Sequence, residues 1–265
     1  MDSSNMIATR SRSLLAFFIL AFALAVPFWV VGAMTKLQLL PGLPVAALMF
    51  ICPGLAALIL AHREKGTAGA KALLRRAFDY KRIKAKVWYA PILLLMPGVM
   101  VLSYGLMRCF GVAVPTPHFS GLRIISLSIV FFFTALGEEM GWSGYAIDPM
   151  QERWNALQAS IFLGSVWAVY HYLPLVEGQR SVTWIAWWSL FTIAFRVLIV
   201  WIYNNTGKSV FGVAVFHATF NVAWQSFPNN GSSWDPRVTA LLTVCAATIV
   251  TVVWGPWTLA RLRNA

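Results

Sequence analysis

Charged side chains are scarce in this sequence: Asp, Glu, Lys and Arg make up 11% of its 265 residues, and only nine are acidic. A soluble domain carries roughly 25% charged residues, so the composition excludes that class. The hydrophobic fraction of 59% excludes an intrinsically disordered chain. There are three cysteines and no CxxC pair, which argues against a cysteine-based metal or redox site.

The sequence contains several long segments without any charged residue. Each run has at least 21 residues, and a helix needs roughly 20 apolar residues to cross the hydrocarbon core. A transmembrane β-barrel would show shorter, alternating segments. We therefore predict an all-α, polytopic helical membrane protein forming a single membrane domain over residues 1–265. The eight expected transmembrane helices are 14–34, 43–61, 87–107, 124–147, 157–176, 182–203, 210–227 and 238–260.

Positive charge is concentrated in one loop: nine of the 21 Lys and Arg residues lie between Arg63 and Lys86. With eight spans and the N-terminus inside, the inner segments hold fifteen Lys and Arg and the outer segments five. The positive-inside rule then predicts an integral protein of the inner or plasma membrane, with both termini cytoplasmic. The lipid bilayer is the expected partner of this charge. No nucleic-acid-binding motif accompanies it, so we expect no nucleic-acid partner.

Ionisable side chains inside predicted spans are few, and each is a candidate functional group because burying it in lipid is costly. They are Glu138 and Glu139 in the fourth span, His171 in the fifth, Arg196 in the sixth and His217 in the seventh. Asn221 lies one helical turn beyond His217. The thirteen Trp residues, by contrast, are interpreted as interfacial belts and packing.

Depth in the membrane suggests that these groups meet. At 1.5 Å per residue, Glu138 lies about 15 Å from the inner end of its span, His171 about 21 Å and His217 about 13–14 Å. Asn221 comes to about 19–20 Å on the same scale. All four fall within roughly 8 Å of one another in depth, near the middle of a core about 30 Å thick. We expect one polar cluster built from the fourth, fifth and seventh spans.

The chemistry of such a cluster suits amide hydrolysis. His171 and His217 are potential Zn²⁺ ligands, and a nearby carboxylate can act as general base and then as general acid. Consecutive helical residues point about 100° apart, so only one of the two glutamates can face a water fully. The other is expected to orient a ligand or to pair with Arg196. The sequence has neither the HExxH of soluble zinc proteases nor a GxSxG elbow.

Three short motifs carry a family resemblance. Residues 138–145 read EEMGWSGY, which is similar to EExxxR; residues 167–171 read WAVYH, similar to FxxxH; and residues 217–221 read HATFN, matching HxxxN. In this order and spacing they resemble the CPBP family of intramembrane proteases. That family includes the type II CAAX prenyl endopeptidases and bacteriocin-processing or abortive-infection-type proteins. The resemblance covers about residues 124–224, which would form the catalytic core.

The resemblance implies a role for each matched residue. Glu138 would activate the water, while His171, His217 and Asn221 would hold the water or a Zn²⁺ ion. Glu139 would support the site from behind. A metal mechanism and a glutamate-centred mechanism both stay open. The departure is Ser143, because the family has an Arg there that supports the second Glu or the substrate's carboxyl end; Arg196 could supply that cation.

The sequence therefore predicts an intramembrane endopeptidase acting on a membrane-associated protein or a C-terminal peptide. A cavity open to the cytoplasmic side, or a lateral gap between helices, is expected to admit the substrate. One alternative is a catalytically weak homologue that binds a membrane partner, which Ser143 favours. A second is a proton-coupled carrier using the two glutamates as relay groups. The absence of a detectable repeat weighs against the carrier.

Overall fold

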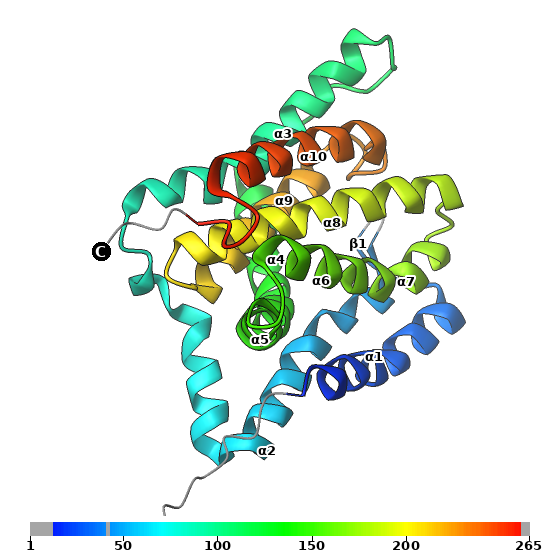
Figure 1. The fold of residues 1–265 in the computed structure, drawn as a ribbon. Helices are drawn as coiled ribbons and strands as arrows, with labels where there is room; N and C mark the ends of the chain where they lie inside the picture. The colour runs from blue at the N-terminus through cyan, green and yellow to red at the C-terminus, as the bar shows by residue number, and fades with distance from the viewer. Residues whose placement is uncertain (1–12, 41–42, 261–265) are drawn as a thin grey trace, which may run out of the picture.

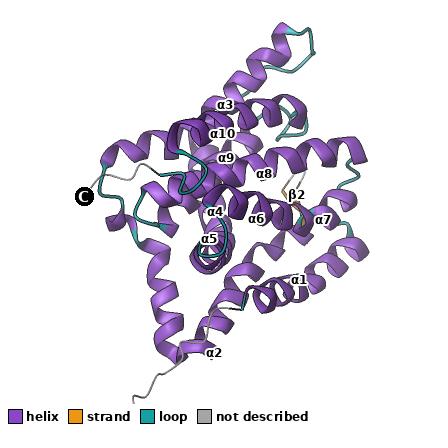
Figure 2. Ribbon diagram, in the orientation of Figure 1, coloured by secondary structure: helices purple, strands orange, loops and turns teal. Residues whose placement is uncertain are grey.

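The computed structural model describes residues 13–40 and 43–260. Nearly all regular structure in these residues is helical, apart from a short antiparallel hairpin of β1 (Gln38–Leu40) and β2 (Leu43–Pro44) (Figure 2). The class predicted from the sequence, a polytopic helical membrane protein, is confirmed. The α-helices in Figure 1 are α1 Leu14–Thr35, α2 Cys52–Arg75, α3 Tyr89–Cys109, α4 Gly121–Gly141, α5 Ile147–Gln151, α6 Ala156–Tyr170, α7 Tyr172–Glu177, α8 Val182–Asn205, α9 Val210–Ser226 and α10 Pro236–Trp254. Shorter helical turns are the 3₁₀ segments η1 Val45–Ile51, η2 Arg76–Phe78, η3 Tyr80–Arg82 and η4 Lys86–Trp88 and the π-helical segment η5 Trp142–Ala146.

The predicted number of eight spans is not confirmed. Six helical segments of the described residues are long and apolar enough to cross a membrane. The predicted fifth and seventh spans correspond to α6, with 15 residues, and α9, with 17. At 1.5 Å per residue these helices are about 22 and 25 Å long, shorter than the roughly 30 Å hydrocarbon core.

Several predicted spans begin or end differently from the expectation, and the eighth, expected to reach 260, ends at Trp254, before Gly255. Residues 43–51 form β2 and η1 instead of the first part of a continuous helix, and α2 then runs on to Arg75. The predicted fifth span is broken at His171, where α6 ends and α7 begins. Pro174 explains the break, because its ring would clash with the carbonyl of Tyr170 in a continuous helix but is tolerated in the first turn of a new one.

Polar caps explain where the later helices start. Asn155, Ser181 and Ser209 each accept a hydrogen bond from a backbone N–H in the first turn of α6, α8 and α9, respectively. Asp235 does the same for α10, which begins at Pro236. Side chains of this kind satisfy N–H groups that a helix start leaves without intrahelical partners.

Helix α8 lies in the middle of the bundle and packs against α6, α9 and α10, while α4 packs between α9 and α2. The close contact of α2 with α4 depends on glycines: a Cβ placed on Gly141 would lie 2.5 Å from the backbone of Pro53. A Cβ on Gly54 would lie equally close, 2.5 Å, to the carbonyl oxygen of Gly137. This packing holds the two consecutive glutamates of α4 at a fixed position inside the bundle.

The orientation in the membrane stays a prediction. Arg10, Arg12, Arg261 and Arg263, which contribute to the predicted charge asymmetry, lie outside the described residues. Helices α1 and α10 nevertheless place the two ends of the described chain at the same end of the bundle, beside the segment 63–86 (Figure 1).

Candidate active site

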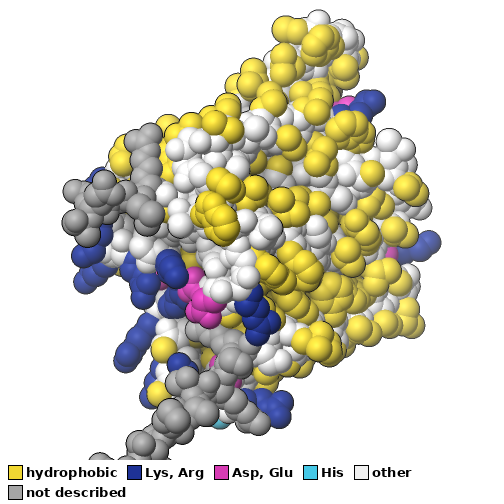
Figure 3. All heavy atoms as spheres, viewed as in Figure 1, with side chains coloured by type: hydrophobic (Ala, Val, Ile, Leu, Met, Phe, Trp, Pro, Cys, Tyr) yellow, Lys and Arg dark blue, Asp and Glu magenta, His cyan; other side chains and the backbone are white. Residues whose placement is uncertain are grey.

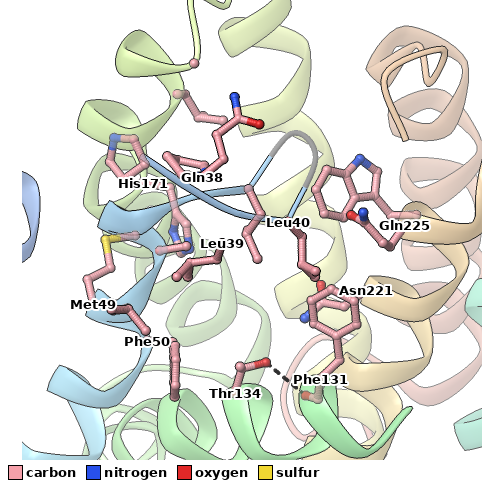
Figure 4. A pocket seen from close by; sticks show the side chains of 18 of the residues that line it. Gln38, Leu39, Leu40, Met49, Phe50, Phe131, Thr134, His171, Asn221 and Gln225 are labelled. Atoms are coloured by element: carbon pink, nitrogen blue, oxygen red, sulfur yellow. Dashed lines mark hydrogen bonds between the residues drawn. The ribbon is translucent and has the colours of Figure 1, made fainter. Parts of the chain in front are cut away.

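A cavity of about 1430 Å³ opens at one end of the bundle. Its walls come from the hairpin, η1, α4, α7, α8 and α9, with smaller contributions from α1 and α6, and most of the lining side chains are apolar. Figure 4 shows Leu39 and Leu40 of the hairpin projecting into the same space as His171 and Asn221. The innermost polar side chains of the lining are Glu138, His171, His217 and Asn221. The structure thus brings together the four side chains for which the sequence predicted similar depths in the membrane.

Glu139 lies behind the cavity wall and is fully buried, with a relative exposure of 0%. Its Oε2 accepts a hydrogen bond from Arg196 Nη1 at 2.9 Å and another from the hydroxyl of Ser143. Its Oε1 lies 3.2 Å from His217 Nδ1, and because a carboxylate only accepts, the ring nitrogen is the donor. Both oxygens of this carboxylate are therefore occupied by protein donors.

Arg196 forms the buried ion pair that the sequence suggested for the sixth span. Its guanidinium carbon lies 4.2 Å from the centre of the Trp167 ring, so the cation also rests on an aromatic face. Arg196 has a relative exposure of 0%, and a cation buried this deeply needs such partners. The resemblance expects an arginine at Ser143, and the cation that pairs with Glu139 here comes from α8. Ser143 itself donates to the same carboxylate.

Glu138 has a different environment. Its Oε2 accepts hydrogen bonds from two indole N–H groups, that of Trp142 at 3.3 Å and that of Trp167. Its Oε1 lies 4.0 Å from His171 Nε2. Because Glu138 lines the cavity and Glu139 does not, only Glu138 can meet a substrate.

The two histidines face the two glutamates through different ring nitrogens. His171 Nδ1 donates to the carbonyl oxygen of Trp167 at 2.9 Å, which leaves Nε2 toward Glu138. His217 donates from Nδ1 to Glu139, so its Nε2 takes no part in that hydrogen bond. The ring of Trp167 stands edge-on to both imidazoles, with centroids 5.7 Å from His171 and 5.1 Å from His217.

Trp142 and Trp167 are the site residues that the sequence interpretation assigned to packing alone. Both are buried, and both donate to Glu138. The spacing contained a signal. Trp142 lies four residues after Glu138, and Trp167 lies four residues before His171, so each tryptophan shares a helix face with a candidate site residue.

The donor set does not assemble the expected zinc site. Among the described residues, no group of three His, Cys, Asp or Glu side chains converges closely enough to hold a metal ion. His171 and His217 each donate one ring N–H to a protein acceptor, which leaves the other nitrogen available, as in metal-bound histidines. Protein zinc sites use three or four ligands of these kinds, and in this conformation the described residues bring only part of such a set together.

Comparison with known proteins agrees with the geometry. Residues 120–223 match the family model described as type II CAAX prenyl endopeptidase Rce1-like. The chain is 27% identical over 230 residues to CAAX prenyl protease 2 of Methanococcus maripaludis, covering 78% of this chain and 82% of that protein.

A more distant similarity is to lysostaphin resistance protein A of Staphylococcus epidermidis, 23% identical over 197 residues. This match covers 73% of the chain but only 49% of that relative, about half its length. The family match includes all five candidate site residues, from Glu138 to Asn221. These comparisons show that residues 120–223 are similar to the type II CAAX prenyl endopeptidase Rce1-like domain, and this similarity supports a membrane-embedded protease.

Proposed function

We propose that this protein hydrolyses a peptide bond in a membrane-associated protein or a C-terminal peptide, with Glu138 activating the attacking water. The single observation that carries the proposal is the contrast between the two glutamates. Glu139 is saturated by Arg196, Ser143 and His217, whereas Glu138 faces the cavity and His171. A general base must reach its substrate, and Glu138 is the carboxylate that can.

The geometry supports a role for each group in the reaction. A separation of 4.0 Å between Glu138 Oε1 and His171 Nε2 is too long for a direct hydrogen bond and suits a water hydrogen-bonded to both. This water attacks the scissile carbonyl carbon and gives its proton to Glu138. Glu138 then passes that proton to the leaving amine nitrogen as the C–N bond breaks.

His217 and Asn221 lie on one face of α9, across the cavity from His171. The amide N–H₂ of Asn221 is a donor suited to the oxyanion that forms during attack. His217, held by Glu139, fixes the position of α9 relative to α4. No step requires a metal ion, and a Zn²⁺ ion at His171 and His217 remains a separate proposal that metal analysis would decide.

The substrate is expected to be apolar near the cleaved bond, because most of the cavity lining is apolar. The name of the archaeal relative adds a prenylated CAAX carboxyl terminus as one candidate. The alternative of a catalytically weak binding homologue depended on the missing arginine at Ser143. Arg196 contacts Glu139 directly, and this contact supports the active protease over the binding homologue.

Glu138→Gln tests this proposal. The variant keeps the size and the hydrogen-bond acceptor of the side chain but loses the base, so we expect cleavage of a library of membrane-anchored and C-terminal peptides to fall at least ~100-fold, the lower range for a general base. The matched control is Glu152→Gln at an exposed position between α5 and α6. Bound zinc is measured in both proteins. Cleavage unaffected in Glu138→Gln, or lost equally in Glu152→Gln, would contradict the assignment.

A further inference from the structure

The two ends of the helix bundle differ in charge. Eleven Lys and Arg residues among the described positions lie at the end where α2 ends and α3 begins: Arg63, Lys65, Lys71, Arg75, Arg76, Lys81, Arg82, Lys84, Lys86, Arg153 and Lys208. The opposite end has five, namely Lys36, Arg108, Arg123, Arg180 and Arg237. Figure 3 shows the dark blue side chains gathered mainly at the left of the view, on the side of the C-terminus. We call these the basic end and the opposite end.

The cavity opens at the opposite end. Its rim includes Lys36 after α1, Arg180 before α8 and Trp234 before α10. Arg123 in the first turn of α4 and Asn230 after α9 also line it. These positions are all helix termini at the same end of the bundle.

The basic end is closed beneath the site. No lining residue comes from 51–122, 139–166 or 196–216 of the described chain. Immediately below Glu138, the side chains of Trp142, Ser143, Tyr145 and Arg196 are all at most 2% exposed. A substrate therefore has no path to Glu138 from the basic end in this conformation.

A hydrogen-bonded network reinforces this closure. Arg76 Nη1 donates to the carbonyl oxygen of Gly144 at 2.7 Å, and its Nη2 donates to the Tyr203 hydroxyl at 2.7 Å and to the carbonyl oxygen of Lys208 at 2.8 Å. Lys208 in turn pairs with Asp148 at 2.9 Å. The basic segment is thus tied across α5, α8 and the start of α9.

From these observations we propose that the active-site cavity opens on the extracytoplasmic side of the membrane, and that the substrate is an apolar peptide segment presented from that side. Lys and Arg in short loops are retained on the cytoplasmic side, so the basic end is cytoplasmic and the cavity mouth is not. This inference adds a side of access to the proposed function. Its statement about a substrate rests on that function, because only a protease has a peptide substrate. It also replaces the expected access from the cytoplasmic side. Exported peptides and extracytoplasmic parts of membrane proteins can reach such a site, whereas a prenylated protein in the cytosol cannot.

Cysteine labelling on intact cells tests the access side without requiring catalysis. Cys52, Cys109 and Cys245 are first replaced by Ser, and single cysteines are then introduced by Leu39→Cys in the cavity lining or Lys71→Cys at the exposed surface of the basic end. A membrane-impermeant maleimide is added to bacterial cells that carry the protein in the plasma membrane. Lysed cells, in which both variants react, serve as the reference.

We expect the Leu39→Cys variant to react at least tenfold more than the Lys71→Cys variant on intact cells. The reverse order, equal labelling of both, or labelling of neither would overturn the proposal. A second arm offers a water-soluble apolar peptide to right-side-out and inverted vesicles, where cleavage only in right-side-out vesicles is expected. If labelling gives the expected order but neither vesicle preparation cleaves peptide, the proposed proteolysis fails while the access side stands.

Discussion

Glu138 and Glu139 are chemically identical neighbours whose environments differ because α4 turns about 100° between them. One faces the cavity, and the other faces α8 and α9, where Arg196 and His217 meet it. Two ionised carboxylates side by side in low dielectric would be strongly unfavourable without such donors. The pairing of Glu139 removes this problem and leaves Glu138 available for chemistry.

Trp167→Phe separates the indole N–H from the aromatic ring. The change removes a donor to Glu138 Oε2 but keeps a ring beside Arg196 and the histidines. A hydrogen bond to a charged group contributes about 1.5–3 kcal/mol, so we expect kcat to fall about 10- to 100-fold with KM little changed. Steady-state cleavage kinetics measure the effect. Trp154→Phe, at a position 40% exposed, is the control and should keep kcat. Equal kcat in the two variants would show that the indole N–H has no positioning role.

Arg196 and Glu139 should be energetically coupled. Removing one member of a buried ion pair leaves an uncompensated charge and costs about 3–5 kcal/mol, whereas removing both costs less than the sum. We therefore compare Arg196→Met, Glu139→Gln and the double variant, measuring the free energy of unfolding in detergent. The coupling energy is expected to exceed about 1 kcal/mol. Additivity within about 0.5 kcal/mol, as for independent sites, would refute direct pairing.

At the scale of the elements, two departures from regular helix occur beside the site. The π-helical segment η5 follows α4 directly after the two glutamates, and α6 breaks at His171. A π-turn frees backbone groups from the regular pattern, and Arg76 of the basic segment donates to the carbonyl oxygen of Gly144 within η5. These irregularities set the directions of Ser143 and His171 toward the glutamates.

Gly141→Ala tests the close packing of α2 on α4. The new methyl group would lie 2.5 Å from the backbone of Pro53, which cannot move aside as a side chain can. Overpacking of this kind costs about 1–3 kcal/mol, so the thermal midpoint in detergent should fall. Gly98→Ala in α3 is the matched control, because nothing lies within 4 Å of a Cβ there. That variant is expected to be neutral or slightly more stable, given the higher helix propensity of alanine. Equal midpoints for the two variants would show that α2 and α4 are not tightly packed.

At the scale of the whole molecule, the cavity exists because several separate elements leave a space that none of them encloses alone. The two shortest of the long helices, α6 and α9, carry His171 at one end and His217 in the middle. Their neighbours α8 and α4 are longer and cover them in the bundle. Polar groups in lipid are tolerated only where protein or a water-filled space surrounds them, and this arrangement provides that surrounding.

Ala47→Phe narrows the cavity from η1, where Ala47 is part of the lining. Because the larger side chain adds bulk without altering Glu138 or its donors, it should weaken binding of the substrate and of the transition state to the same extent. We expect KM to rise about tenfold, equivalent to about 1.4 kcal/mol, with kcat nearly constant. Leu94→Phe on α3, at a side chain 67% exposed and outside the cavity, should leave both constants unchanged. An unchanged KM in Ala47→Phe would mean that substrate does not occupy this part of the cavity.

Much of the architecture could be predicted from one chain because the bilayer imposes strong local rules. Charge-free runs of sufficient length predicted the long helices closely: the first span was expected at 14–34 and α1 covers Leu14–Thr35. Counting residues along each predicted span likewise placed Glu138, His171 and His217 at similar depths in the membrane. Both predictions depend only on helix rise and on the cost of placing polar groups in lipid.

What the sequence by itself determined is therefore the class of protein, the rows of apolar residues that form its helices and the small set of polar groups buried among them. The tertiary structure decided which glutamate faces the cavity, that Arg196 pairs with Glu139, that Trp142 and Trp167 donate to Glu138, and at which end the cavity opens. The physical reason is range: hydropathy and helix rise act along one segment, whereas these contacts depend on how helices rotate and pack against one another across the bundle.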